Sequence, residues 1–208
     1  MQEPEILEVP EFKPQQSSKT KSILREILET LVLTAIIFFI VNSVTGRFKI
    51  FGQSMENTFQ SGQYIIVNRL AYRLGQPQRG DVVVFVPPGY PESTFAERLI
   101  GLPGETDYIK RIIGIPGDTI RTEGSQLLVN GQVIAEPYIR DPMNSAYDGR
   151  EWSLGPNQYF ALGDNRNASK DSRDPSVGPV DGNSIVGKVW VVYWPVSDWQ
   201  LVVHYRYP

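Results

Sequence analysis

Hydrophobic and polar positions divide the chain into one long apolar run near the N-terminus and a remainder with strand-like patterning. The run "LVLTAIIFFIV", residues 31–41, is apolar on every face of a helix, which is typical of a segment surrounded by lipid. Residues 30–46 contain no charged side chain, and this length is at the short end of what a bilayer requires. We therefore expect a transmembrane anchor at 22–46. A tail at 1–21, rich in Pro, Glu, Gln and Ser, is expected to be disordered.

Two other interpretations of the apolar run are open, a buried amphipathic helix and a cleaved signal peptide. The first is disfavoured because the run has no polar face. The second is disfavoured because the preceding segment is long and acidic. Basic residues are slightly more numerous before the run than after it, which predicts a cytoplasmic N-terminus and the bulk of the chain on the outer side. They are Lys13, Lys19, Lys21 and Arg25 before the run and Arg47 and Lys49 after it.

From residue 47 onward the pattern is that of short strands separated by turns. "YIIVNRL", "DVVVFV", "YIKRIIGI", "QLLVNGQVIA" and "GKVWVVYW" are rich in β-branched and aromatic residues and are bounded by Gly, Pro and Asp. Asn130-Gly131 predicts a two-residue type I′ hairpin. We expect a mainly β protein, an antiparallel sheet or barrel-like domain formed by 47–118 and 155–208, with a small β-hairpin insertion at 119–154.

The amino-acid composition excludes several kinds of binding and catalytic site. The formal net charge of −3 argues against nucleic-acid binding. The chain has no cysteine, which excludes disulfides and cysteine-ligated metal, and its one histidine, His204, excludes a multi-histidine metal site within the chain. Any catalysis must therefore rely on Ser, Lys, Asp, Glu, Tyr or Arg.

The stretch "FGQSMENTF" holds a candidate nucleophile, Ser54, between a glycine-containing approach and a polar turn. A candidate proton acceptor is Lys110, which stands in the otherwise apolar strand "DYIKRIIGIPGD". Side chains alternate along a strand, so Tyr108 and Lys110 share one face while Arg111 points to the other. Burial lowers the pKa of a lysine, and a neutral lysine paired with serine is a recognised catalytic arrangement. The alternative is a partly exposed lysine on an edge strand.

A third polar stretch, "GDNRNASKDSR" at 163–173, follows a predicted strand. Carboxylates and guanidinium groups alternate in it and can form bidentate pairs that fix a loop. Its serines can orient a neighbouring amine. The alternative is an ordinary solvated, turn-rich loop.

Taken in order, these motifs resemble those of the bacterial type I signal peptidases. The resemblance extends over roughly residues 22 to 190 and includes the apolar run, "GQSMENTF", "RGDVVVF", "YIKRIIGIPGDTI", "GDNRNASKDSR" and "IVGKVWVVYWP". Eukaryotic relatives carry histidine at the position of the base, so Lys110 is similar to the bacterial and organellar members. The resemblance implies a membrane-anchored serine endopeptidase that cleaves N-terminal signal peptides from exported preproteins.

The resemblance also assigns roles to individual residues. It implies that Ser54 is the nucleophile, that Lys110 is the general base and that Ser169 orients the amine. Some family members have a serine two residues before the nucleophile, and its hydroxyl helps to form the oxyanion hole. This chain has Gly52 there, so backbone N–H groups, including that of Ser54, are the expected donors. A further departure is Asn57, where the family usually has proline, so we expect a less restrained turn.

Supporting and substrate-binding residues follow from the same resemblance. Asp171 with Arg173 would brace the polar loop, and Asp164 would meet Arg111. The substrate would lie extended against "RFKIFGQS" and "DYIKR" as an added strand. If the first of these stretches is a regular strand, Phe48, Ile50, Gly52 and Ser54 share one face. This alternation, with Tyr108 beside Lys110, makes Phe48, Ile50 and Tyr108 expected substrate-binding residues, and the resemblance adds Met55 and Ile109.

Other classes of protein share some of these features. Self-cleaving repressors share the Ser–Lys pair but are soluble and carry a DNA-binding domain. Penicillin-binding proteins require S-x-x-K, whereas "SMEN" lacks the lysine. A catalytically inactive, membrane-tethered β module that binds peptides is the remaining alternative. The expected partners are signal peptides of exported preproteins and the lipid bilayer of a cell membrane or an internal, thylakoid-type membrane. No cofactor, metal or nucleic acid is expected.

Overall fold

A computed structural model describes residues 17–73, 75–91, 94, 96–97 and 107–207 of the chain. The chain divides into two compact units, the first ending at Phe39 and the second beginning at Ile40. The disordered tail expected at 1–21 lies largely outside the described residues.

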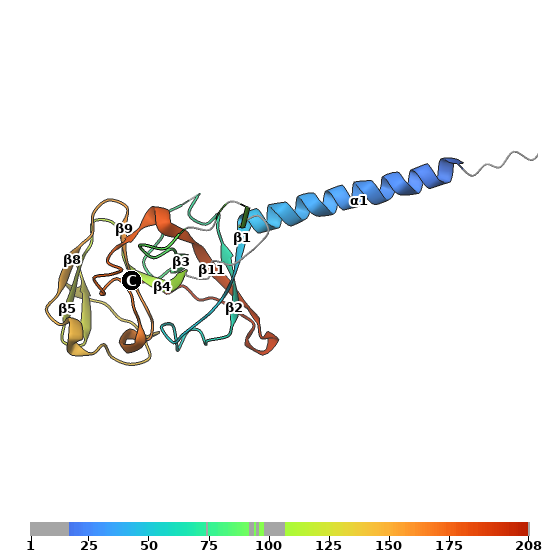
Figure 1. Ribbon diagram of the computed structural model, residues 1–208. Coiled ribbons are helices and arrows are strands. Elements are labelled where there is room, and N and C mark those ends of the chain that lie inside the picture. Colours follow the sequence, from blue (N-terminus) through green and yellow to red (C-terminus); the bar gives the residue numbers. More distant parts are fainter. Residues whose placement is uncertain (1–16, 74, 92–93, 95, 98–106, 208) are drawn as a thin grey trace, which may run out of the picture. The chain divides into compact units, whose positions relative to one another are not determined.

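The N-terminal helix α1, Ser17–Val44, contains the apolar run (Figure 1). It begins before the expected anchor start at residue 22. Its stretch Ser22–Val44 has a mean hydropathy of 2.2, and nearly all of the side chains there are exposed. By length and composition this helix could cross a membrane, and such extensive exposure of apolar side chains disfavours a helix buried in a soluble core.

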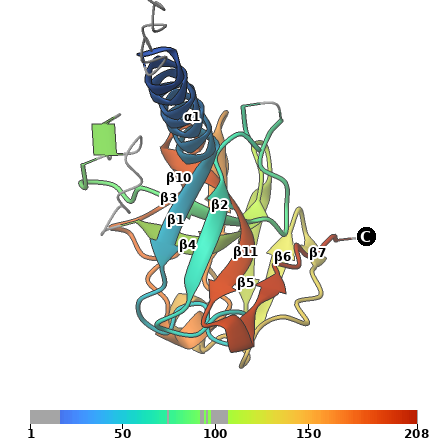
Figure 2. The same ribbon diagram turned by 90° about the vertical axis from the view of Figure 1, so that its right-hand side faces the viewer.

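The second unit is built on a curled antiparallel sheet with the strand order β1-β2-β11-β3-β4-β9-β10, and β12 pairs with β11 (Figures 1 and 2). The neighbours β1, β2 and β11 run side by side in Figure 2. The strands are β1 Thr45–Lys49, β2 Tyr64–Asn68, β3 Val82–Phe85, β4 Tyr108–Gly114, β9 Gln158–Leu162, β10 Val180–Asp181, β11 Ile185–Trp194 and β12 Gln200–Leu201. The mainly β antiparallel class expected from the sequence is confirmed.

A second, smaller antiparallel sheet has the order β7-β6-β5-β8. Its hairpin turn is formed by Asn130 and Gly131, whose φ angles of 52° and 78° suit a type I′ turn. Its strands are β5 Thr119–Glu123, β6 Gln126–Val129, β7 Gln132–Val133 and β8 Glu151–Ser153. All lie within the expected insertion at 119–154, whose boundaries stay a prediction. Short 3₁₀ turns join other segments at Ser145–Tyr147, Arg166–Ala168, Gly182–Ser184 and Val196–Asp198.

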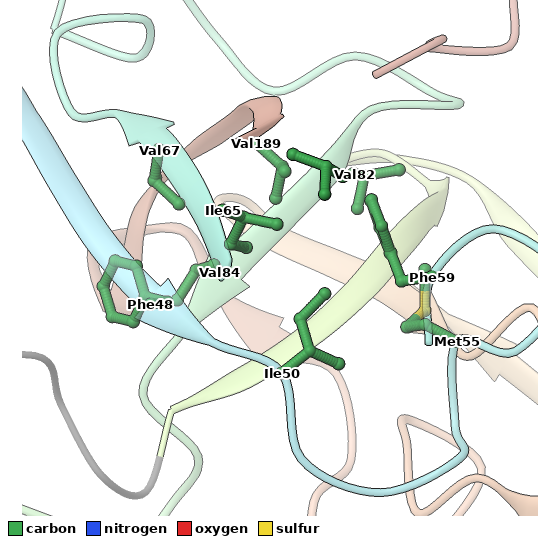
Figure 3. Close-up of a cluster of buried hydrophobic side chains, with 10 residues drawn as sticks. Phe48, Ile50, Met55, Phe59, Ile65, Val67, Val82, Val84 and Val189 are labelled. Carbon is green, nitrogen blue, oxygen red and sulfur yellow. The ribbon is translucent and has the colours of Figure 1, made fainter. Parts of the chain in front are cut away.

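The hydrophobic core fixes the segment that follows β1. Phe48 in β1 and Ile50 just beyond it are buried with Ile65, Val67 and other side chains of the sheet (Figure 3). Met55 and Phe59, from the turns after β1, enter the same cluster and are each 2% exposed (Figure 3). Ser54 therefore stands next to a residue that is anchored in the core.

The strand expected for "RFKIFGQS" is shorter than the pattern suggests. β1 ends at Lys49, and residues 52–58 form a bend and turns. Pairing persists for one more step because Ile50 N donates to Gln63 O at 2.8 Å and Gly62 N donates to Ile50 O at 2.9 Å. The regular alternation assumed for residues 48–54 therefore does not hold beyond Ile50.

Candidate active site

Ser54 and Lys110 meet where the turn after β1 approaches β4. Lys110 Nζ lies 2.8 Å from Ser54 Oγ and 2.9 Å from the carbonyl oxygen of Ile109. The lysine is 4% exposed and Ser54 is half-buried. Neither oxygen bonded to the amine carries a formal charge, so the ammonium form has no ion-pair partner in these contacts.

Burial lowers the pKa of Lys110 to about 8, while the carboxylates of Asp171 and Asp164 act in the opposite direction. Both carboxylates are paired with arginines, Asp171 with Arg173 and Asp164 with Arg111. At pH 8 about half of such an amine is neutral, whereas an ordinary lysine is less than about 1% neutral. Lys110 can therefore accept a proton at a pH where most lysines cannot.

The turn that carries Ser54 is fixed by its backbone. Gly52 has a φ of +80°, which glycine adopts without strain. Thr58 N and Phe59 N both donate to Met55 O, at 3.0 and 2.8 Å. Asn165 N, from the polar loop, donates to Ser54 O at 3.1 Å. The nucleophile candidate is thus held from both sides by main-chain hydrogen bonds.

Asn57 occupies the position where the family usually has proline, and it has a φ of +89°. Proline is restricted to a φ near −65° and cannot adopt this conformation. The side chain of Asn57 instead donates from Nδ2 to Tyr138 O at 2.8 Å. The turn is therefore tied to a distant segment, although the sequence alone suggested a less restrained turn.

Arg111, next to Lys110 on β4, lies in a fully paired environment. Its guanidinium contacts Asp164 through two hydrogen bonds, Nε to Oδ1 at 2.9 Å and Nη2 to Oδ2 at 2.7 Å. Nη1 donates to Gly80 O at 3.0 Å. Thr58 Oγ1 donates to Asp164 Oδ2 at 2.5 Å, so this buried pair also holds the nucleophile turn.

The polar loop is braced by a second buried pair. Arg173 contacts Asp171 through Nε and Nη2, each at 2.8 Å, and both residues are 1% exposed. Asp171 Oδ2 also accepts from Gly163 N at 3.1 Å. A carboxylate that accepts from a guanidinium and from the backbone fixes the loop in one conformation.

Ser169 lies close to the nucleophile but does not hydrogen-bond the amine of Lys110. A Cβ added at Gly163 would collide with the Ser169 side chain and with Ser54 O, so both flank this glycine. Ser169 Oγ is buried and has no hydrogen-bond partner among the described residues. The expected hydrogen bond to Lys110 Nζ is not formed in this conformation.

A cleft of about 470 Å³ opens beside the pair. Every residue expected to bind substrate lines it, together with Gly52, Ser54 and Lys110. Those residues are Phe48, Ile50, Met55, Tyr108 and Ile109. The other described residues that line the cleft are Lys49, Phe51, Gln53, Tyr90, Asp107, Ala168 and Lys170.

Two strand edges border this cleft. Among the described strands, β1 pairs with β2 alone. On β4, Ile112 bonds to Asp81 O and Gly80 N beside β3, so the main-chain groups of Ile109 point away from β3. β9 pairs with β4 only from Arg111 onward. The edge at Ile109 is therefore unpaired by any described strand and can accept an extended peptide.

The single histidine of the chain is not part of this site. His204 Nδ1 accepts from Val82 N at 3.1 Å and does not line the cleft. Burial, with the nearby charge of Lys188, lowers the pKa of His204 to about 4. Among the described residues, no group of three His, Asp or Glu side chains is arranged to hold a metal ion.

Sequence reasoning missed the segment that connects the polar loop to the second sheet. Arg166 forms a bidentate pair with Glu136, at 2.6 and 2.5 Å, and donates from Nε to Gly163 O at 3.1 Å. The ring of Tyr138 covers the Arg111 guanidinium at 4.1 Å from the ring centroid. The available signal was Glu136 and Tyr138 in a short polar stretch after the hairpin, which does not identify partners 30 residues away.

Comparisons with known proteins agree on one family. The model of the family described as "Signal peptidase, peptidase S26" matches residues 23–194. Signal peptidase I from Leptolyngbya laminosa is 31% identical, over 91% of this chain and 90% of that protein. Probable signal peptidase I-2 from Synechocystis sp. is 33% identical over 90% and 81%, and signal peptidase I from Bacillus caldolyticus is 37% identical over 74% and 82%.

A solved structure of a signal peptidase I from Enterococcus faecalis is 27% identical to the chain, with a TM-score of 0.40, over 54% of this chain and 96% of that one. The family model covers most of the chain, and relatives above 30% identity align over most of both lengths. The chain therefore belongs to the signal peptidase family, peptidase S26, and is a serine peptidase, a hydrolase.

Proposed function

We propose that this protein is a membrane-anchored endopeptidase that removes N-terminal signal peptides from exported preproteins, with Ser54 as nucleophile and Lys110 as general base. The observation that carries the proposal is the 2.8 Å contact between Ser54 Oγ and the buried amine of Lys110. The family and the names of the relatives support the substrate class.

The chemistry requires the neutral amine. Its lone pair accepts the proton of Ser54 Oγ as the oxygen attacks the scissile carbonyl carbon. The resulting ammonium then gives this proton to the departing amine when the C–N bond breaks. Water attacks the acyl-enzyme, again losing a proton to Lys110, and the Ser54 oxygen is released with that proton.

Three groups are proposed to support these steps. Backbone N–H groups at Gly52 and Ser54 would stabilise the oxyanion, because the positive φ of Gly52 lets the main chain turn there without a side chain. The hydroxyl of Ser169 would orient the amine after a rotation about its χ1 bond, since it lies beside Gly163 with no partner. The pairs Asp164–Arg111 and Asp171–Arg173 would hold the two loops.

The substrate is proposed to bind as an added strand between residues 48–54 and the edge of β4 at Tyr108–Lys110. The main chain of Ile109, which faces no described strand on that side, would supply hydrogen bonds. Phe48, Ile50 and Met55 are buried and fill the floor of the cleft, so only small side chains would fit beside the nucleophile.

Helix α1 is proposed to anchor the chain in a cell membrane or an internal membrane, with a cytoplasmic N-terminus and the β unit, comprising 47–118, 119–154 and 155–208, on the outer side. The basic residues before the apolar run support this orientation. External protease should reach loops of the β unit in intact right-side-out vesicles. Complete protection of this unit, with the N-terminal tail cut instead, would reverse the orientation.

The decisive experiment incubates the purified chain, in detergent, with a preprotein and maps the new N-terminus. The proposed function predicts one cut after the signal peptide, and loss of this cut in Ser54→Ala. Binding of the preprotein without any cut would favour the alternative, an inactive membrane-tethered peptide-binding module.

A further inference from the structure

Residues 202–207, called the C-terminal segment below, lie beyond the residues that the family model matches, which end at 194. The segment is nevertheless attached to the sheet. Val202 N donates to Trp190 O at 3.0 Å, and His204 Nδ1 accepts from Val82 N at 3.1 Å. The segment therefore follows β11 and β3 before it reaches the neighbourhood of Arg111.

Tyrosines of the segment pack on Tyr138. The ring centroid of Tyr205 lies 5.5 Å from that of Tyr138 and 4.8 Å from that of Tyr207, both in edge-on geometry. The hydroxyl of Tyr207 contacts the hydroxyl of Tyr138, which also donates to Glu136 Oε1 at 2.8 Å. Burial raises the pKa of both Tyr138 and Tyr207, so both hydroxyls remain protonated and able to donate.

Tyr138 is linked to the turn that carries Ser54 in two ways, one direct and one through Arg111 and Asp164. Its carbonyl oxygen accepts from Asn57 Nδ2 at 2.8 Å. Its ring covers the guanidinium of Arg111, which holds Asp164, and Asp164 accepts from Thr58 Oγ1. Asn57 and Thr58 are three and four residues after Ser54, so both routes end on the same turn.

The segment also lies against Gly80, the residue whose carbonyl oxygen binds Arg111. Arg111 Nη1 donates to Gly80 O at 3.0 Å. Gly80 has a φ of +92°, and a Cβ there would collide with the carbonyl oxygen of Tyr205. The main chain of the segment is thus packed directly against the residue that holds Arg111, while its side chains pack on the residue that covers Arg111.

We propose that Tyr205 and Tyr207 are positioning residues, which hold the turn carrying Ser54 through Tyr138 and Arg111. This inference rests on the proposed function. Both tyrosines lie outside the cleft, so they act on the geometry of the nucleophile and not on substrate binding. Their loss is expected to lower kcat and to leave KM nearly unchanged.

The test compares four single variants of the full chain in detergent with a short peptide that spans a cleavage site. Tyr205→Ala should lower kcat about tenfold or more, because displacement of a reacting group by about 1 Å can cost about a hundredfold. Tyr205→Phe keeps the ring and should therefore have the kcat of the wild type. Tyr207→Phe loses only the hydroxyl contact and should lower kcat less than Tyr205→Ala does. Arg206→Ala changes an exposed residue between them and should match the wild type.

Each variant is assayed below its melting temperature, with circular dichroism confirming the folded state. Wild-type kcat in folded Tyr205→Ala would overturn the inference, as would an equal loss in Arg206→Ala or an effect confined to KM. If Tyr205→Ala does not fold, Tyr207→Phe decides, and a wild-type kcat there would overturn the inference. Ser54→Ala separates the two claims, because activity in that variant would contradict the proposed function itself.

Discussion

Lys110 and Arg111 are neighbours on β4, and both are almost completely buried. Their environments differ, however, and shift the pKa values of the two side chains in opposite directions. Arg111 is surrounded by acceptors, a bidentate carboxylate and a backbone carbonyl. Burial acts to lower the pKa of Arg111, but the hydrogen bonds it donates to Asp164, together with the negative charge of that carboxylate, outweigh burial and raise the pKa. Lys110 meets only uncharged oxygens, and burial lowers its pKa to about 8.

This difference shows how one strand can provide both a support and a base. Alternation sends successive side chains to opposite faces, so two cations can be buried side by side without sharing an environment. A guanidinium paired with a carboxylate keeps its proton, whereas a buried amine without such a partner can lose it. The Arg111 face is expected to matter mainly for stability, and the Lys110 face mainly for chemistry.

The largest effect should come from removing the proposed pair. Ser54→Ala and Lys110→Met should each lower kcat/KM by at least about 10⁴-fold, and the double variant should be no worse, because residues that act as one unit are not additive. Peptide cleavage measures this. Lys188→Met is the matched control, since Lys188 pairs with Asp81 at 2.6 Å and does not line the cleft. Substantial activity in folded Lys110→Met would remove lysine as the base.

The second prediction compares how much the Arg111 side chain and the Lys110 side chain each contribute to the stability of the fold. Arg111→Met leaves Asp164 buried without its cation and should lower the free energy of unfolding by about 3–5 kcal/mol. Lys110→Met removes a buried amine that has no carboxylate partner, so it should cost much less or even stabilise. Chemical denaturation in detergent measures both. Equal losses for the two variants would contradict the contrast.

Much of this arrangement could be predicted from sequence because its signals are local. The β-rich pattern, the Asn130-Gly131 hairpin and an apolar strand interrupted by Lys110 are each visible within a few residues. Strand alternation placed Phe48, Ile50 and Tyr108 at the expected cleft, and the family resemblance added Met55 and Ile109. All five line the cleft in the structure.

What could not be predicted depends on contacts between distant segments. The bidentate pair of Arg166 with Glu136 and the contact of Asn57 with Tyr138 join residues 30 and 81 positions apart. No periodicity records such contacts. The end of β1 at Lys49 was also missed, because Ile50, Met55 and Phe59 are apolar like strand residues but enter the core from positions beyond the strand.

The third and smallest effect concerns substrate on the Lys110 face. An extended peptide points its first and third residues before the scissile bond the same way, toward the cleft floor formed by Phe48, Ile50 and Met55. Ala→Leu at either position should lower kcat/KM about tenfold or more, since overfilling a packed site costs about 1–3 kcal/mol. The same change at the residue between them should have little effect. Efficiencies that are flat across a peptide series would refute this strand placement.

The central claim is that the amine of Lys110 is neutral in the working enzyme, and the pH dependence of kcat/KM for a peptide without ionisable groups tests it most directly. Because only the neutral amine can accept the proton, the rate should fall as pH drops below the lowered pKa and should level off above it. The account predicts a single rising limb with an apparent pKa of about 8. A rate that keeps rising toward an ordinary lysine pKa of about 10.4 would contradict it. So would a rate that does not change from about two pH units below the lowered pKa to about one unit above it.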